Sequence, residues 1–337
     1  MSAARRARLG VVGVGRMGSV HVANLAHACP AAELVACYDA DAAAAAAVAA
    51  RYGVIAASSV GELFGAHGLD GIVIATPTGS HAPLALQAAD ARLAVFVEKP
   101  ISLDRPATLQ VVETFENAGL TLQVGFNRRF DDTVADVARR VRDGELGAPY
   151  LLRISQRDMA PPRPEFLVGS GGIFLDMGIH DFDLARFLVG EVVRVSAVGT
   201  AVSDPAFAEI GDFDTAVATL EFDNGALGVV DLSRVAGYGY ESSTELVGEK
   251  ATVRLEMPPA LLAEWRRPGE ATHALLSSYD RRYGPAFATE LDAFARAILD
   301  ASPSLVTGRD ALAAFDLAQA ATRACVLGRP VALDELS

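Results

Sequence analysis

Gly13-Val14-Gly15-Arg16-Met17-Gly18 is the stretch that decides the fold of this 337-residue chain. An apolar strand over residues 8–14 is expected to lead into it, and a helical pattern over residues 19–28 follows. In such a strand–turn–helix unit the first glycine makes a tight turn, the second lets the backbone approach a pyrophosphate, and the third allows close packing of the helix. The helix N-terminus then faces the phosphates. The stretch therefore predicts a dinucleotide-binding Rossmann domain.

Asp39 ends a second expected strand, over residues 33–38, and stands 21 residues after Gly18. A carboxylate at this place accepts hydrogen bonds from the adenosine ribose hydroxyls and repels a 2′-phosphate. No arginine or lysine directly follows it, since the next residues are Ala40-Asp41-Ala42. The expected cofactor is therefore NAD and not NADP. The alternative is a glycine-rich turn that binds no ligand.

Ala75-Thr76-Pro77 leaves the carboxyl end of another expected strand, over residues 71–75, and this is the edge at which a doubly wound sheet binds its ligand. His81 begins the next helix, and we expect it to cap that helix or to line the nicotinamide ribose. The complete set of residues predicted to bind the cofactor is Gly13, Gly15, Arg16, Met17, Gly18, Asp39, Ala75, Thr76, Pro77, His81, Glu98 and Lys99.

Lys99 follows a short strand over residues 94–97 and lies within Glu98-Lys99-Pro100. A lysine at the carboxyl end of a parallel strand, beside the expected nicotinamide, is an acid/base group if burial lowers its pKa. Pro100 restricts Lys99 to an extended backbone and so aims its side chain. An isolated lysine is usually a solvated surface charge, but this position favours a catalytic role.

The second half of the chain changes its periodicity. We place the boundary near residue 126, which gives an NAD-binding Rossmann domain over 1–125 and a substrate-binding and oligomerisation domain over 126–337. Asp223-Asn224-Gly225 predicts a tight hairpin, and Thr307-x-x-Asp310 resembles a capping box before a helix over 310–327. Expected strands cover residues 150–156, 192–200, 215–222, 226–233, 243–246 and 251–255.

The expected fold class is therefore α/β, with an N-terminal doubly wound parallel sheet and a C-terminal α+β domain whose sheet is largely antiparallel. Helices are expected over residues 132–143 and 286–299 in this second domain. The exposed face of its sheet needs a cover, which indicates a homo-oligomer.

Gly171-Gly172-Ile173-Phe174-Leu175-Asp176-Met177-Gly178-Ile179-His180 begins a helical pattern that places charge beside its apolar face. Asp176, His180 and Asp183 fall on one stripe at helical spacing. A carboxylate four residues before a histidine can fix the imidazole tautomer and stabilise its protonated form. The alternative is a half-exposed structural ion pair.

Three polar loops accompany this segment: residues 157–164, Tyr238-Gly239-Tyr240 and residues 280–283. Each alone is more often ordinary loop chemistry. Together their carboxylates, arginines and tyrosines could surround a ligand that carries many hydroxyl groups.

Composition excludes several classes of protein. Apolar residues make up 51% of the chain and charged residues 21%, which is typical of a globular protein. The net charge of −13 argues against a nucleic-acid partner. No apolar run reaches the roughly 18 residues needed to cross a membrane, and residues 2–8 show no cleavable signal pattern. The three cysteines are scattered without metal spacing, so we expect a cytoplasmic protein without disulfides or a bound metal.

These motifs together resemble those of the Gfo/Idh/MocA oxidoreductase family over essentially the full chain, and within it most those of the inositol 2-dehydrogenases. The matching features are the glycine motif at 13–18, Glu98-Lys99-Pro100, and Gly171-Gly172 leading to Asp176-x-x-x-His180. Segments 125–131, 172–177 and 180–183 are similar almost word for word.

The resemblance implies an NAD-dependent oxidation of a cyclitol alcohol to a ketone, most simply myo-inositol to 2-keto-myo-inositol, by a homo-oligomer, with a tetramer favoured. It implies that Lys99, Asp176 and His180 are the catalytic set. These three would also contact the substrate, together with Arg128, Arg129, Asp158, Tyr238 and Tyr240.

In the implied mechanism His180 or Lys99 takes the hydroxyl proton and the other group stabilises the developing charge. The sequence leaves the formal base open between these two coupled groups. Met159 and Glu241-Ser242-Ser243 depart from the family pattern in the presumed substrate region. They leave open a dehydrogenase of another polyol, an aldose or an amino-cyclitol, and an NAD-binding sensor without turnover is the remaining alternative.

Overall fold

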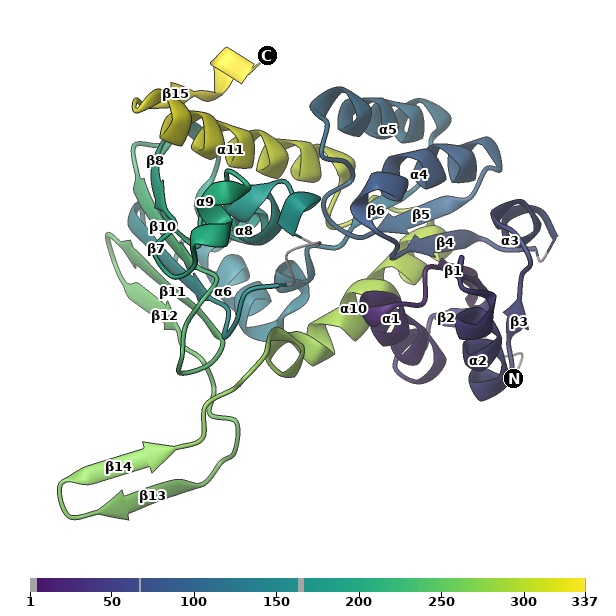
Figure 1. Cartoon of the computed structure of the whole chain (residues 1–337), viewed down its shortest axis with the longest axis horizontal. Coiled ribbons are helices and arrows are strands. Elements are labelled where there is room, and N and C mark those ends of the chain that lie inside the picture. Colours follow the sequence, from purple (N-terminus) through teal and green to yellow (C-terminus); the bar gives the residue numbers. More distant parts are fainter. Residues whose placement is uncertain (1–4, 67, 163–166, 337) are drawn as a thin grey trace. The chain divides into compact units, whose positions relative to one another are not determined.

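The computed structural model of the chain describes residues 5–66, 68–162 and 167–336 (Figure 1). These residues divide into two compact units. The first unit runs to Phe130 and takes up Pro285–Leu312, and the second unit comprises Asp131–Gly284 and continues from Ala313. The expected boundary near residue 126 differs from this division, because the chain returns to the first unit late in the sequence.

The first unit contains a six-stranded parallel sheet in the order β3-β2-β1-β4-β5-β6. This is the strand order of a dinucleotide-binding Rossmann fold, so the predicted doubly wound sheet is confirmed. Strands β4 and β5 carry apolar, buried residues throughout, as expected where helices cover both faces of the sheet. Its strands are β1 (Ala7–Val12), β2 (Ala32–Tyr38), β3 (Ile55–Ala56), β4 (Gly71–Ile74), β5 (Ala94–Val97) and β6 (Leu122–Val124). Its helices include α1 (Arg16–His27), α2 (Ala42–Tyr52), α3 (Val60–Ala66), α4 (His81–Asp90) and α5 (Arg105–Ala118).

Helix α10 (Tyr279–Asp300) carries the chain back to the first unit. The Phe294 ring packs against the Phe96 ring of the sheet, with centroids 6.0 Å apart, and the Ala31 backbone N–H donates to Asp292 Oδ1 at 2.8 Å. The sequence predicted a helix here but assigned it to the second domain. An apolar helical stripe shows that a helix packs against a core, but it does not show which core.

The second unit is built on a seven-stranded sheet in the order β12-β11-β7-β10-β9-β8-β15. All neighbouring strands are antiparallel except β7 and β10, so the predicted largely antiparallel sheet is confirmed. Its strands are β7 (Pro149–Arg157), β8 (Val192–Thr200), β9 (Thr215–Phe222), β10 (Leu227–Ser233), β11 (Glu241–Gly248), β12 (Thr252–Leu255) and β15 (Val331–Ala332).

Helices α6 (Asp132–Arg142) and α8 (Ile179–Val189) contact strands of this sheet and lie on one side of it (Figure 1). Preceding α8 is a π-helical turn, η3 (Phe174–Gly178), which contacts β10. Burial alternates along β9, which indicates one covered face and one open face. The unit also contains the short helix α9 (Pro205–Glu209).

Two local predictions for this half are confirmed. The β9–β10 hairpin turns at Asp223–Gly225, where Gly225 has a φ of +85°. Thr307 and Asp310 exchange hydrogen bonds at the start of α11 (Gly308–Leu327), as a capping box requires. A further hairpin, β13 (Glu264–Arg267) with β14 (Glu270–His273), was not predicted, and its two strands form a sheet of their own. None of the helices in the described ranges has the length and apolarity needed to cross a membrane.

Candidate active site

The glycine-rich turn between β1 and α1 leaves no room for side chains at two of its three glycines. Gly13 has a φ of +86°, and a Cβ there would lie 2.8 Å from the Ala75 carbonyl oxygen. A Cβ on Gly18 would lie 1.9 Å from the Gly13 carbonyl oxygen. Gly15 faces open space, and no side chain caps the first turn of α1, which begins at Arg16 and Met17. The start of a helix favours negative charge, so this helix end fits the phosphates of a dinucleotide.

Asp39 is held against this turn by backbone groups. Its Oδ2 accepts from the Val14 N–H at 2.7 Å, and its Oδ1 accepts from the Asp41 N–H at 2.9 Å. The carboxylate lies at the carboxyl end of β2, next to the glycine-rich turn. This arrangement fits the ribose of a dinucleotide whose phosphates lie at the start of α1.

The loops after β4 and β5 are joined by His81, whose side chain is buried. His81 Nδ1 lies 2.8 Å from the Pro100 carbonyl oxygen, and Nε2 lies 2.7 Å from the Thr76 carbonyl oxygen. Thr76 Oγ1 also accepts from the Ser80 hydroxyl at 2.7 Å. His81 was predicted to cap α4 or to line the cofactor. Its ring connects Thr76, beside Ala75 and Pro77, with the residue that follows Lys99.

Lys99 follows β5 and precedes Pro100 through a cis peptide bond. The neighbouring Glu98 was predicted to bind the cofactor, and its Oε1 lies 2.7 Å from Nε2 of the buried His21. Burial alone would raise the pKa of the Glu98 carboxyl. The hydrogen bond from His21 and the positive charges of His21, Lys99 and His81 outweigh burial and hold that pKa below its ordinary value. Glu98 therefore supplies a negative charge near Lys99.

A second acid, Glu290 on α10, is fully buried in the same unit. Neither carboxyl oxygen has a hydrogen-bond partner among the described residues. Burial, followed by the charge of Glu98, raises the pKa of Glu290 well above its ordinary value. The surroundings therefore shift the pKa of Glu290 upward and that of Glu98 downward. Sequence reasoning missed both Glu290 and His21, because neither belongs to a motif.

Arg128 and Arg129 lie in the 3₁₀ turn η2 (Asn127–Phe130), and both are buried. Arg129 Nη2 donates to Asp310 Oδ1 at 3.1 Å within the first unit. Burial raises the pKa of Asp310, but the charge of Arg129 and the Thr307 hydrogen bonds lower it by more than burial raises it. The pKa of Asp310 is therefore below its ordinary value. Arg129 therefore supports the start of α11 in addition to its predicted place in the substrate pocket.

The second unit carries Asp176 in the π-helical turn η3 and His180 in the first turn of α8. The sequence predicted one regular helix, but a π-helical turn is wider than an α-helical turn and is frequent at functional sites. Asp176 Oδ2 accepts from Nη1 of Arg234 at 3.0 Å. Sequence reasoning missed Arg234, because it stands 58 residues from Asp176 and no local pattern connects the two.

Two of the three predicted polar loops lie at strand ends: residues 158–162 follow β7, and Tyr238–Tyr240 lie between β10 and β11. Residues 163 and 164 of the first loop lie outside the described residues, and residues 280–283 were predicted as a loop but belong to α10. The Asp158 N–H donates to the Ser233 carbonyl at 2.9 Å, and the Asp158 carbonyl accepts from the Ala236 N–H at 2.8 Å. Tyr240 is buried, whereas Tyr238 is half exposed. These hydrogen bonds hold the backbone of Asp158 beside the chain that leads to both tyrosines.

Glu241, one of the departures from the family pattern, accepts hydrogen bonds from the Tyr238 hydroxyl and from Ser243 Oγ. Burial, together with the hydrogen bond and charge of Glu241, raises the pKa of Tyr238 to about 12. The Tyr238 phenol therefore stays neutral at physiological pH. Its donor proton is already used by Glu241.

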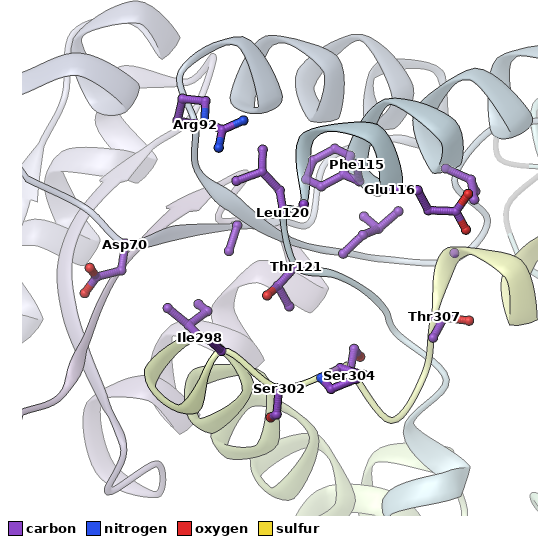
Figure 2. Close-up of a pocket in the computed structure, with 17 residues that line it drawn as sticks. Asp70, Arg92, Phe115, Glu116, Leu120, Thr121, Ile298, Ser302, Ser304 and Thr307 are labelled. Atoms are coloured by element: carbon purple, nitrogen blue, oxygen red, sulfur yellow. The ribbon is translucent and has the colours of Figure 1, made fainter.

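A cavity of about 480 Å³ lies elsewhere in the first unit, at the amino ends of β4, β5 and β6 (Figure 2). Its charged lining residues have partners in the protein: Asp70 accepts from Arg5, Arg92 donates to the Ala118 carbonyl, and Glu116 pairs with Arg309. A Rossmann sheet binds its dinucleotide at the opposite, carboxyl edge. Among the described residues, no group of three or more His, Cys, Asp or Glu side chains is arranged to hold a metal ion.

Comparisons with known proteins cover both units. Residues 7–126 match the oxidoreductase family model with an NAD-binding Rossmann fold, and residues 134–254 match the GFO/IDH/MocA C-terminal domain. The chain is 35% identical to scyllo-inositol 2-dehydrogenase (NAD⁺) of Bacillus subtilis, with 97% of this chain and 96% of that protein covered. It is 36% identical to myo-inositol 2-dehydrogenase of Thermotoga maritima, with 98% and 99% covered.

The fold is also similar to solved structures. The crystal structure of a putative myo-inositol dehydrogenase from Sinorhizobium meliloti aligns with a TM-score of 0.93 at 36% identity. The alignment covers 97% of this chain and 99% of that chain. The similarity therefore extends over the nucleotide-binding sheet and the seven-stranded sheet alike.

Proposed function

Because the chain belongs to the Gfo/Idh/MocA family of NAD-dependent oxidoreductases, we propose that it oxidises a secondary hydroxyl of a cyclitol to a ketone. The first candidate substrate is myo-inositol, with 2-keto-myo-inositol as the product. The full-length match to enzymes named for inositol oxidation carries this proposal, since it covers both family domains at once. The glycine-rich turn with Asp39 supports NAD as the cofactor.

In the proposed reaction, bound NAD supplies the hydride acceptor. His180 removes the proton of the reacting hydroxyl, and the negative charge of Asp176 supports the imidazolium that forms. Lys99 donates a hydrogen bond to the same oxygen and stabilises its developing charge. The positive charge of Lys99 is among the interactions that lower the pKa of the neighbouring Glu98 carboxyl. His180 and Lys99 act as a coupled pair, so pH–rate measurements report values that belong to both groups.

The remaining hydroxyl groups of the substrate require donors and acceptors from the predicted pocket residues. Arginines provide planar sets of donors, and a carboxylate provides acceptors. In this proposal Arg128, Arg129, Asp158 and Tyr240 contact these hydroxyl groups. Tyr238 contributes its ring and the acceptor lone pairs of its hydroxyl, because Glu241 already takes its proton.

The Tyr238–Glu241 contact also favours a second candidate substrate class. Glu241 is a carboxylate where the family pattern leads us to expect a different sequence, and Met159 in the neighbouring loop is half exposed. A carboxylate at this place can accept from an additional donor, such as the ammonium group of an amino-cyclitol. The same reaction on another polyol, an aldose or an amino-cyclitol is therefore the alternative.

A substrate panel tests the proposal. Purified protein with NAD is mixed with myo-inositol, scyllo-inositol, chiro-inositol, glucose, xylose or an amino-cyclitol, and NADH absorbance is followed, with NADP as the cofactor control. We expect the highest kcat/KM for myo-inositol with NAD. Faster turnover of the amino-cyclitol would select the alternative. NAD binding without turnover on any member would contradict the proposed function and favour a sensor.

We also infer that the protein is a cytoplasmic homo-oligomer, with a tetramer favoured. Val198, Val217 and Leu227 are exposed on the open face of the seven-stranded sheet. The strand register places them on the same face, since Val198 is opposite Val217 and Leu227 is opposite Glu221. Apolar side chains grouped on an open sheet face favour association. Light scattering would show a mass of several subunits, and a monomer at micromolar concentration would contradict this inference.

A further inference from the structure

We propose that Arg234 is a positioning residue, which fixes the orientation of Asp176 through a clamp that it shares with Asp212. The clamp consists of Ile173, Asp176, Asp212 and Arg234, all in the second unit. Its catalytic meaning rests on the proposed function, because Asp176 belongs to the proposed catalytic set.

Arg234 directly follows β10, and its side chain is fully buried. Nη1 donates to Asp176 Oδ2 at 3.0 Å, and Nη2 donates to Asp212 Oδ2 at 3.3 Å. The Arg234 backbone N–H donates to the Asp214 carbonyl oxygen at 2.8 Å. A buried guanidinium is stable only when carboxylates compensate for its loss of water. Here two carboxylates from different parts of the chain do so.

Asp212 connects this guanidinium to the beginning of the turn that carries Asp176. Its Oδ1 accepts from the backbone N–H of Ile173 and of Phe213, each at 2.8 Å. Gly172 has a φ of +85°, and a Cβ there would lie 3.2 Å from Asp212 Oδ1. The two glycines of the Gly171-Gly172 motif therefore let the chain pass close to Asp212. The carboxylate in turn binds the first N–H after them.

The π-helical turn is consequently held at its start, in its middle and at its end. Asp212 binds it at Ile173, and Arg234 binds it at Asp176. Its far end packs closely on β10, since a Cβ on Gly178 would lie 2.9 Å from Leu232 Cδ1. These contacts leave little freedom for the Asp176 carboxylate to rotate away from its place. His180 follows one turn later, so the clamp also sets where α8 begins.

A lysine cannot replace this arginine fully. The planar fork of a guanidinium reaches two carboxylates in fixed directions, whereas an ammonium group is a single point charge on a flexible stem. The clamp therefore predicts that kcat falls by different amounts in three variants. Arg234→Met removes both contacts, Arg234→Lys restores charge without the fork, and Asp212→Asn keeps the shape of the side chain but removes its charge.

The test compares these variants with a matched control, Arg139→Met. Arg139 also bridges two aspartates, Asp136 at 2.7 Å and Asp143 at 2.9 Å, but on the exposed surface of α6. The measurements are kcat, KM and the deuterium isotope effect with substrate labelled at the carbon that loses hydride. NAD titration reports on the first unit, which does not contain the clamp.

We expect kcat to fall about 10²-fold in Arg234→Met, the effect of misplacing a group by roughly 1 Å, with a smaller change in KM. The isotope effect should rise, because the chemical step becomes slower while substrate and product exchange do not. A mere loss of folded molecules would lower the rate and leave the isotope effect unchanged. Arg234→Lys should recover about tenfold of the loss, since it restores one of two charged contacts. Arg139→Met should match the wild type.

A kcat within twofold of wild type and an unchanged isotope effect in Arg234→Met would overturn the proposal. If that variant does not fold, the same two criteria apply to Asp212→Asn. If the wild-type protein oxidises no member of the panel, the proposed function fails and the clamp is judged by backbone hydrogen exchange over residues 173–178. Faster exchange in Asp212→Asn than in Arg139→Met would support it, and equal exchange would overturn it.

Discussion

The two units pair their partly or fully buried carboxyl groups with different basic side chains. In the first unit Glu98 is hydrogen-bonded to His21, and Glu290, whose pKa is raised well above its ordinary value, is buried near it. In the second unit Asp176 and Asp212 share Arg234. Histidines commonly gain and lose a proton near neutral pH, whereas an arginine keeps its charge in any folded protein. The first group therefore contains two carboxyl groups whose pKa values are shifted in opposite directions, and the second contains a fixed positive charge.

This difference suggests different tasks. Two carboxyl groups whose surroundings push their pKa values in opposite directions are typical of places where protons are held or moved. A guanidinium between two carboxylates holds geometry instead, because its planar fork binds both of them in fixed directions. In the proposed reaction the first arrangement supports Lys99 through Glu98. The second arrangement orients the acid/base residue His180 through Asp176.

The largest expected effect follows from removing that acid/base residue. His180→Ala should lower kcat by about 10²- to 10⁴-fold, the usual contribution of a positioned proton acceptor. Steady-state NADH formation measures it, and NAD affinity should stay unchanged. His273→Ala, at an exposed histidine of β14, is the matched control. Near-wild-type turnover in His180→Ala would show that His180 is not the acid/base residue. Arg234 and its two aspartates would then have a structural role only.

A second variant tests Asp39, a carboxylate that is held by backbone N–H groups and thus differs from both Glu98 and Asp176. The Asp39 carboxylate accepts hydrogen bonds from the backbone N–H groups of Val14 and Asp41. Asp39→Ala should weaken NAD binding about tenfold or more, the value of a hydrogen bond to a charged group, and should narrow the preference over NADP. Calorimetric titration measures both affinities.

Asp41→Ala is the control for this variant. Asp41 caps α2 through the N–H groups of Ala43 and Ala44, so its loss should destabilise that helix end without changing NAD affinity. Unchanged NAD affinity in Asp39→Ala would show that this carboxylate serves only the glycine-rich turn.

The contrast between Asp39 and Asp176 also shows what a sequence can predict. The glycine turn, Asp39, the Asp223–Gly225 hairpin and the Thr307–Asp310 capping box depend on short spacings and local backbone geometry. The structure confirms the Rossmann sheet and both local motifs. These features can be predicted from the sequence because the residues that cause them are close together in the chain.

The missed features depend on residues that meet only after folding. Arg234 reaches Asp176 across 58 positions, and Glu290 enters the first unit on a helix that follows all but the last strand of the seven-stranded sheet. The π-helical turn was missed for a related reason. Its hydrogen-bond shift is supported by Asp212 and β10, so the spacing of its own residues still fits a regular helix.

The next expected effect is a stability change with a characteristic pH dependence. Glu290 has a folded-state pKa well above its ordinary value of 4.5, so the folded state holds this proton more tightly than the unfolded chain does. Its favourable contribution is complete below pH 4.5 and is lost as the pH rises toward the folded-state value. Glu290→Gln removes the titrating group and keeps its shape.

Thermal unfolding from pH 4 to 9 measures the effect. Glu290→Gln should unfold near the wild-type temperature at the acid end and above it at the alkaline end. Each kcal/mol gained should raise Tm by about 2–4 °C for a unit of this size. A Tm difference that does not change with pH would show that Glu290 is not held as a neutral acid. It would also remove the contrast with the Arg234 clamp.

The smallest expected effect comes from an ion pair that shares its chemistry with the clamp but not its burial. Arg309 donates to both oxygens of Glu116 at 2.8 and 2.5 Å, and both side chains are about half exposed. The hydrogen bond from Arg309 and then its charge lower the pKa of Glu116 despite slight burial. Any stabilisation of the fold by this pair is therefore present above pH 4.5 and fades as the pH falls.

Glu116→Gln should lower the free energy of unfolding by about 0.2–1 kcal/mol, and by less in high salt, because water and salt screen exposed charges. Denaturant unfolding at low and high salt measures this. A loss that exceeds that of Asp212→Asn, or one that salt does not reduce, would mean that burial is not what distinguishes the clamp from a surface pair.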